Sequence, residues 1–202
     1  MATAAPNKTY VEANKKLMRF EILPGLPTHG PMAVSFTERA MRGEVEFREG
    51  LVVRFFPEKS DPWVGNFLGG MTKCTTVLDH PNGVDVIVVA KGDVCIIDPE
   101  ARTIKGRIGG DDITSVLPQP SLGLVIFQGY VDFTAVRADN SGWSSPRISW
   151  DGFRNINVQG AKLSGDAYTP VVGDAWVPFT LDLLTGDCTD GVYEKKWPGR
   201  YV

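Results

Sequence analysis

The chain has 202 residues, which suits one large domain or two small ones, and its 43% hydrophobic and 22% charged residues are typical of a soluble globular protein. A formal net charge of −3 argues against a general nucleic-acid binder, because neutralising phosphates requires concentrated Lys and Arg. Three cysteines without close spacing argue against a disulfide framework or a zinc knuckle. Since no stretch reads as a signal peptide or a membrane span, we expect a cytoplasmic protein.

Residues 1–30 are expected to form a partly irregular lead-in, and residues 31–202 a single all-β domain of about four hairpin units. Within the lead-in, "TYVEANKKLMRF" favours a short helix or a disordered segment. The following "LPGLPTHGP" is typical of a Pro/Gly loop without regular structure. One helical turn is expected near Thr37–Met41 before the strands begin.

From Glu44 onward the chain repeats one plan: an apolar run, a residue followed by Gly, a second apolar run and a polar turn. The glycines in question are Gly50, Gly92, Gly129 and Gly160. Each predicts a tight hairpin, because Gly takes positive φ without a Cβ clash. Runs such as "VDVIVVA" and "LGLVIF" predict strands, and their consecutive apolar residues predict strands buried on both faces.

A first strand can be added before two of these hairpins, in "CTTVLDH" and "DITSVLP", which gives units of four strands. Four-stranded units that bury both faces against one another are typical of propeller blades. We therefore expect an all-β fold of antiparallel hairpin or meander units, propeller-like. A β-sandwich built from the same hairpins is the alternative.

Asp151-Gly152 is a strong two-residue hairpin signal between "RISW" and "FRNINV". In that pairing Trp150 and Phe153 lie on one face, while Ile156 and Val158 lie on the other. This strand is therefore also predicted to be apolar on both faces.

The stretches "PRISWDG" and "GDAWVPFTLDLLTG", together with "GLVVRFFPEKSDPWVGNF", resemble a pattern found in uncharacterised bacterial proteins with propeller-like blades. The resemblance covers residues 30–191. It implies a bacterial source and an unassigned function, and it implies no catalytic residues.

Signatures of catalysis are missing from the sequence. The two histidines, His29 and His80, lie in Pro/Gly-rich turns without a motif that would pair them with a nucleophile. Asp111 and Asp112 are adjacent, so in a strand they would point to opposite faces. "GRIGGDD" departs from the dinucleotide-binding fingerprint. We predict no catalytic residue, no metal and no cofactor, and expect that the protein is not an enzyme.

The leading hypothesis is a non-catalytic protein-interaction or ligand-binding module, with a bacterial immunity-type protein as one form. The alternative is a carbohydrate-binding protein or carbohydrate-active enzyme, because aromatic rings beside carboxylates suit sugars. Expected partners are a protein or a small ligand, with neither nucleic acid nor a membrane, and a second copy could cover open sheet edges in a homo-oligomer. Both hypotheses use the same candidate ligand-binding residues: Trp143, Trp150, Asp151, Asp174 and Trp176.

Overall fold

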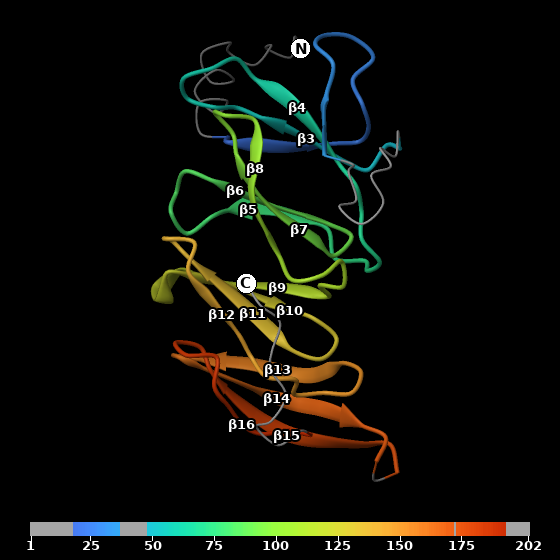
Figure 1. Ribbon diagram of the computed structural model, residues 1–202, viewed down its shortest axis with the longest axis vertical. Coiled ribbons are helices and arrows are strands. Elements are labelled where there is room, and N and C mark those ends of the chain that lie inside the picture. The colour runs from blue at the N-terminus through green and yellow to red at the C-terminus, as the bar shows by residue number, and fades with distance from the viewer. Residues whose placement is uncertain (1–17, 37–47, 172, 193–202) are drawn as a thin grey trace, which may run out of the picture. The chain divides into compact units, whose positions relative to one another are not determined.

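A computed structural model describes residues 18–36, 48–171 and 173–192 of the chain (Figure 1). Most of the predicted N-terminal helix, the helical turn near Thr37–Met41 and the run "EVEF" lie outside these residues. The described residues form four sheets of four strands each, with one short 3-10 helix. They divide into two compact units, one from residues 1–68 with 99–102 and the other from residues 69–98 with 103–202.

The first unit holds the first sheet, whose strand order is β1-β3-β4-β2. Its strands are β1 (Phe20–Leu23), β2 (Val34–Phe36), β3 (Leu51–Phe55) and β4 (Trp63–Phe67). Strand β1 lies among the residues expected to form a lead-in, and β2 pairs parallel with β4 whereas the other pairs are antiparallel. Stacked rings make the core of this sheet, with ring centroids 4.4 Å apart for Phe55 and Trp63 and 4.9 Å apart for Phe36 and Phe67.

The second unit holds three antiparallel meanders, each made of four strands consecutive in the sequence. The second sheet contains β5 (Thr76–Asp79), β6 (Val86–Ala90), β7 (Asp93–Asp98) and β8 (Thr103–Ile108). The third contains β9 (Ser115–Gln119), β10 (Leu124–Gln128), β11 (Phe133–Arg137) and β12 (Gly142–Ser144), with the 3-10 helix η1 (Pro120–Leu122) between β9 and β10. The fourth contains β13 (Phe153–Gln159), β14 (Lys162–Thr169), β15 (Ala175–Asp182) and β16 (Cys188–Asp190).

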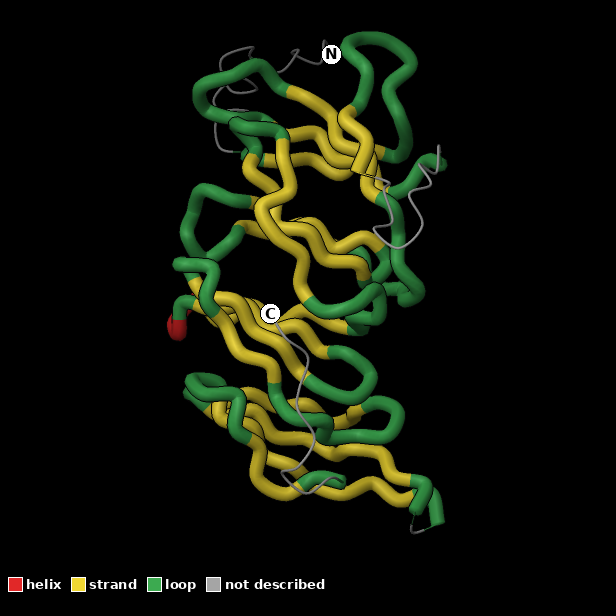
Figure 2. The backbone as a smooth tube through the Cα atoms, in the orientation of Figure 1, coloured by secondary structure: helices red, strands yellow, loops and turns green. Residues whose placement is uncertain are grey.

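The predicted strands and most predicted turns of this unit are confirmed, but Gly129 begins a longer loop between β10 and β11 and does not have positive φ. Lys91 and Gly92 both have positive φ, 48° and 92°, and form a two-residue turn between β6 and β7, as the right-handed twist of a hairpin requires. The loops shown in Figure 2 join neighbouring strands within each meander. Four consecutive antiparallel strands are the form of a propeller blade, so the expected all-β, propeller-like class is confirmed. The β-sandwich alternative fails here, because a sandwich packs two sheets and this unit stacks three.

Within the second unit, the third sheet is the middle layer and is apolar on both faces (Figure 1). Leu124 and Ile126 of β10 pack against the fourth sheet, in a cluster with Leu163 and Phe179. The alternate residues Val125 and Phe127 pack with Ile87 and Val89 of the second sheet. Consecutive apolar residues in β10 therefore pack into two different cores, on opposite faces of the sheet, as the sequence predicted.

Strand β13 contradicts the prediction that it is apolar on both faces. Arg154 pairs with Asp166 and Asn157 with Ser164, so β13 has one residue more than β14 between these pairs. This β-bulge contains Asn155 at a φ of 54°, a conformation that Asn tolerates better than most residues. The extra residue shifts the alternation, and Phe153, Ile156 and Val158 all pack against the same core.

The predicted hairpin at Asp151-Gly152 is also wrong. Strand β13 pairs with β14, and the preceding "RISW" is a connection rather than a partner strand. The Trp150 amide donates to the Tyr168 carbonyl at 3.0 Å, and the Gly152 amide donates to the Tyr130 carbonyl at 2.7 Å. The Tyr168 carbonyl thus takes the Trp150 amide, which in a two-residue hairpin would donate to the Phe153 carbonyl. The described residues include no helix with the length and hydropathy to span a bilayer.

Candidate functional site

Trp143 does not join the other predicted site residues. It lies on β12 with 8% of its surface exposed, within the core between the third and fourth sheets. Its indole N–H donates to the Leu183 carbonyl at 2.9 Å, so the polar atom of the ring is satisfied in the interior. The ring also lies where a Cβ on Gly186 would collide with it, at 2.7 Å. Trp143 fixes the turn between β15 and β16 from within.

The remaining four predicted residues lie around one tyrosine of β14, Tyr168. The Tyr168 hydroxyl donates to the Asp174 carboxylate at 2.6 Å. Its ring lies 5.4 Å from that of Trp176, its partner in the β14–β15 register. Trp150, 41% exposed, is attached through its amide to the Tyr168 carbonyl, and Asp151 follows it on the surface.

Both carboxylates favour the protonated form of Tyr168. The hydrogen bond to Asp174 is the largest cause that raises the pKa of Tyr168, and the charges of Asp174 and Asp151 raise it further. The phenol therefore stays protonated through the neutral range and serves as a hydrogen-bond donor. Neither Asp151 nor Asp174 forms an ion pair with any described cationic side chain.

Tyr168 and Trp176 belong to the face of the fourth sheet that points away from its core. Leu163, Ala167, Phe179 and Leu181 face the core, so the residues that alternate with them on β14 and β15 face outward. We call this surface the outer face, and it comprises Arg154, Ser164, Asp166, Tyr168, Trp176, Pro178 and Thr180.

A cation already lies on the outer face. The Arg154 guanidinium is 4.5 Å from the centre of the Trp176 ring and 3.3 Å from the Asp166 carboxylate. Asn155, at the bulge, donates to the same carboxylate at 2.7 Å. A second arginine, Arg147, lies 5.4 Å from the ring of Trp150. The surface thus combines Trp, Tyr and Arg, which are the residues that dominate binding energy at protein interfaces.

The arrangement is less suited to stacking a sugar. Arg154 covers one face of Trp176, in the position that a sugar ring would take. The carbohydrate alternative therefore requires Arg154 to move.

Sequence reasoning missed Arg154, Asp166 and Tyr168. The signal for Asp166 and Tyr168 was present, because polar residues recur at every second position from Ser164 along β14. Arg154 could not be assigned to this face from the sequence, since the bulge that follows it decides which side chains of β13 point outward.

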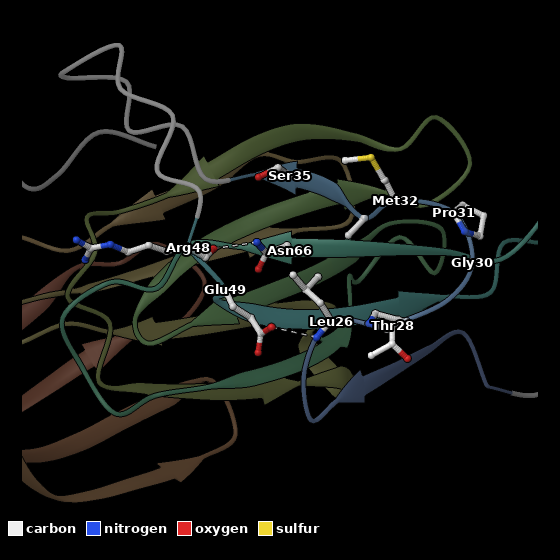
Figure 3. Close-up of a pocket in the computed structure, with 11 residues that line it drawn as sticks. Leu26, Thr28, Gly30, Pro31, Met32, Ser35, Arg48, Glu49 and Asn66 are labelled. Carbon is white, nitrogen blue, oxygen red and sulfur yellow. Dashed lines mark hydrogen bonds between the residues drawn. The ribbon is translucent and has the colours of Figure 1, made fainter.

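A pocket lies in the first unit, beside the loop "LPGLPTHGP" (Figure 3). Its volume is about 420 Å³ and Leu26, Thr28, Met32 and Ser35 are among its lining residues. Two of its polar side chains are already engaged, since Glu49 accepts from the Leu26 amide at 3.2 Å and Asn66 donates to the Arg48 carbonyl at 3.0 Å. These bonds attach the loop and the residues before β3 to the sheet, so we assign them a structural role.

His80 and the cysteines also have structural roles. His80 is 1% exposed, in the turn between β5 and β6, and burial is the main cause that lowers its pKa, so it is neutral at pH 7. Its Nδ1 accepts from the Asn82 amide at 3.3 Å, and nearby Asp85 pairs with Lys105 at 2.8 Å. Burial raises the pKa of the Cys95 thiol to about 12, which keeps it protonated and unreactive. Among the described residues no three His, Cys, Asp or Glu side chains gather as metal ligands would.

Comparisons with known proteins give distant likenesses. No protein-family model and no curated protein matches the sequence. Among solved structures, the β-propeller domain of Cps50 (Swd1) from Myceliophteria thermophila is 14% identical with a TM-score of 0.41, over 75% of this chain and 56% of that one. A eukaryotic initiation factor is 11% identical with a TM-score of 0.39 over 70% and 39%, and a puromycin hydrolase 16% identical with a TM-score of 0.39 over 69% and 24%. The chain spans less than two thirds of each of these proteins, and at such scores none of them indicates a function.

Proposed function

We propose that the protein is a non-catalytic interaction module that binds a protein partner through the outer face of the fourth sheet. The observation that carries this proposal is the side-by-side placement of Tyr168 and Trp176, with Arg154 against the Trp176 ring, on a surface that no apolar layer of the described residues covers. Tryptophan and tyrosine at the centre of an interface are among the residues that contribute most of its binding energy.

The surroundings of these residues support the same function. Paired strands hold the three side chains, and their mutual contacts already restrict their conformations. Binding a partner therefore costs less side-chain entropy. The neighbouring Trp150 and Asp151 extend the surface along its edge. A single sheet thus offers a preformed polar and aromatic patch, which suits a partner recognised without large rearrangement.

Photo-crosslinking in the cells that produce the protein tests this proposal. A photo-reactive phenylalanine analogue replaces Pro178 on the outer face in one variant, and replaces Val84, on an exposed turn of the second sheet, in the control. We expect a defined adduct from position 178 that is absent at position 84. Adding Trp176→Ala to the position 178 variant should remove most of that adduct.

The size of the adduct separates the forms that the module can take. An adduct of one copy with one foreign protein, stable through purification, is what an immunity-type protein that masks its partner would give. An adduct of twice the chain mass means a homo-oligomer. No adduct at position 178, or equal adducts at both positions, would overturn the proposal.

A further inference from the structure

The fourth sheet and its turns carry more negative than positive charge. Residues 147–192 contain six aspartates against two arginines and one lysine, a formal charge of −3. Several of the aspartates have local roles: Asp182 and Asp187 hold the turn before β16, and Asp166 pairs with Arg154. Asp151 and Asp174 remain on the surface without a cationic partner among the described residues.

The structure also shows how this surface holds a guanidinium. Arg154 lies over the Trp176 ring and against the Asp166 carboxylate, which supply a cation–π contact and a charge-assisted hydrogen bond. The group formed by Tyr168, Asp174 and Asp151 offers the same two elements, an aromatic ring and a carboxylate, a short distance along the sheet. In the second group no described arginine or lysine is paired with the carboxylates.

Resting on the proposed function, we infer that the outer face binds a basic, arginine-containing segment of its protein partner. A guanidinium of that segment takes the place beside Tyr168, against the carboxylates of Asp151 and Asp174. Arg154 limits this affinity, because it adds a positive charge to the surface and occupies Trp176 and Asp166. Complementary charge of this kind speeds encounter and selects against acidic partners.

Fluorescence anisotropy with three labelled peptides tests the inference. The peptides have the same length and Gly-Ser spacers, and each carries four Arg, four Lys or four Glu residues. We expect the Arg peptide to bind most tightly, the Lys peptide more weakly because it lacks the planar group that stacks on aromatic rings, and the Glu peptide not at all. Binding should weaken as salt is raised.

Matched charge variants locate the site. Asp151→Asn with Asp174→Asn should weaken binding of the Arg peptide about 5-fold, in line with two exposed ion pairs. Glu58→Gln with Asp61→Asn removes the same charge from the first unit and should leave the affinity unchanged. Arg154→Ala should tighten binding about 3-fold by removing the competing guanidinium. A damaged fold cannot produce this gain.

The outcomes separate the inference from the function on which it rests. If the Asp151/Asp174 variant and its control bind the Arg peptide equally, or the Glu peptide binds as well as the Arg peptide, the inference is wrong. Crosslinking at position 178 would in that case still support an interaction module with a different partner chemistry. If the Asp151/Asp174 variant weakens binding but crosslinking fails, the cation site stands and the proposed function does not.

Discussion

The third and fourth sheets have the same meander topology but use their faces differently. In β10 of the third sheet, Ile126 and the next residue, Phe127, are both fully buried and belong to cores on opposite faces. In β15 of the fourth sheet, Phe179 is buried while the next residue, Thr180, is partly exposed. The difference follows from position, since an interior layer must be apolar on both faces and a terminal layer has a face left for solvent or a partner.

Single substitutions in neighbouring residues test this contrast, and they have the largest expected effects on stability. Ile126→Ala and Phe127→Ala should each lower the free energy of unfolding by about 2–5 kcal/mol, because each leaves a cavity in a packed core. In the fourth sheet, Phe179→Ala should cost about 3–5 kcal/mol but Thr180→Ala within about 0.5 kcal/mol. Urea denaturation of the four variants measures these values. A cost for Thr180→Ala comparable with that of Phe179→Ala would show that the outer face is buried by another part of the protein.

The bulge at Asn155 decides which side chains β13 presents to the outer face, and it offers a second test. Asn155→Val should cost roughly 1–2 kcal/mol more than Asn155→Gly, because a β-branched residue resists the positive φ that Gly adopts freely. Both variants lose the hydrogen bond to Asp166, so their difference isolates the backbone conformation. Equal stabilities would mean that the bulge can move along the strand.

Strands β10 and β13 also show what the sequence could and could not predict. The apolar runs located β6, β10 and most of the hairpin turns, because periodicity and Gly placement are local signals. The Asp151-Gly152 signal was misleading because a distant acceptor, the Tyr168 carbonyl, takes the Trp150 amide that a hairpin would pair with Phe153. Apart from Asn155 itself, the sequence contains no local sign of the bulge. The face of the sheet on which Arg154 lies could therefore not be predicted.

The sequence also predicted the candidate site only in part. Trp150, Asp151, Asp174 and Trp176 were selected as aromatic and acidic residues near turns, and all four lie around Tyr168. Trp143 was selected by the same rule but is buried, since the Leu183 carbonyl and Gly186 give its ring a place in the core. Residue type alone cannot separate a tryptophan that anchors a core from one that lies on a surface.

A smaller effect concerns the Arg154–Trp176 pair. If the outer face is open to solvent, a double-mutant cycle with Arg154→Ala and Trp176→Leu should give a coupling of no more than about 1 kcal/mol, as for other exposed cation–π contacts. The coupling should change little with salt compared with that of the Arg154–Asp166 pair, which is screened. A coupling several times larger would mean that this pair of residues stabilises the fold.

The smallest expected effect is on the titration of Tyr168. Its pKa should lie above the ordinary value of 10.0, first because its hydroxyl donates to Asp174 and then because of the negative charges nearby. Asp174→Asn should bring it back toward the ordinary value, and ¹³C NMR of labelled tyrosine rings resolves the change. Because the folded-state pKa is raised, the stability linked to this group is complete below the pKa of the unfolded chain and is lost as the pH rises through that of the folded state. If Asp174→Asn leaves the titration unchanged, the two side chains are not coupled in solution, and the carboxylate is not held where a partner's guanidinium would need it.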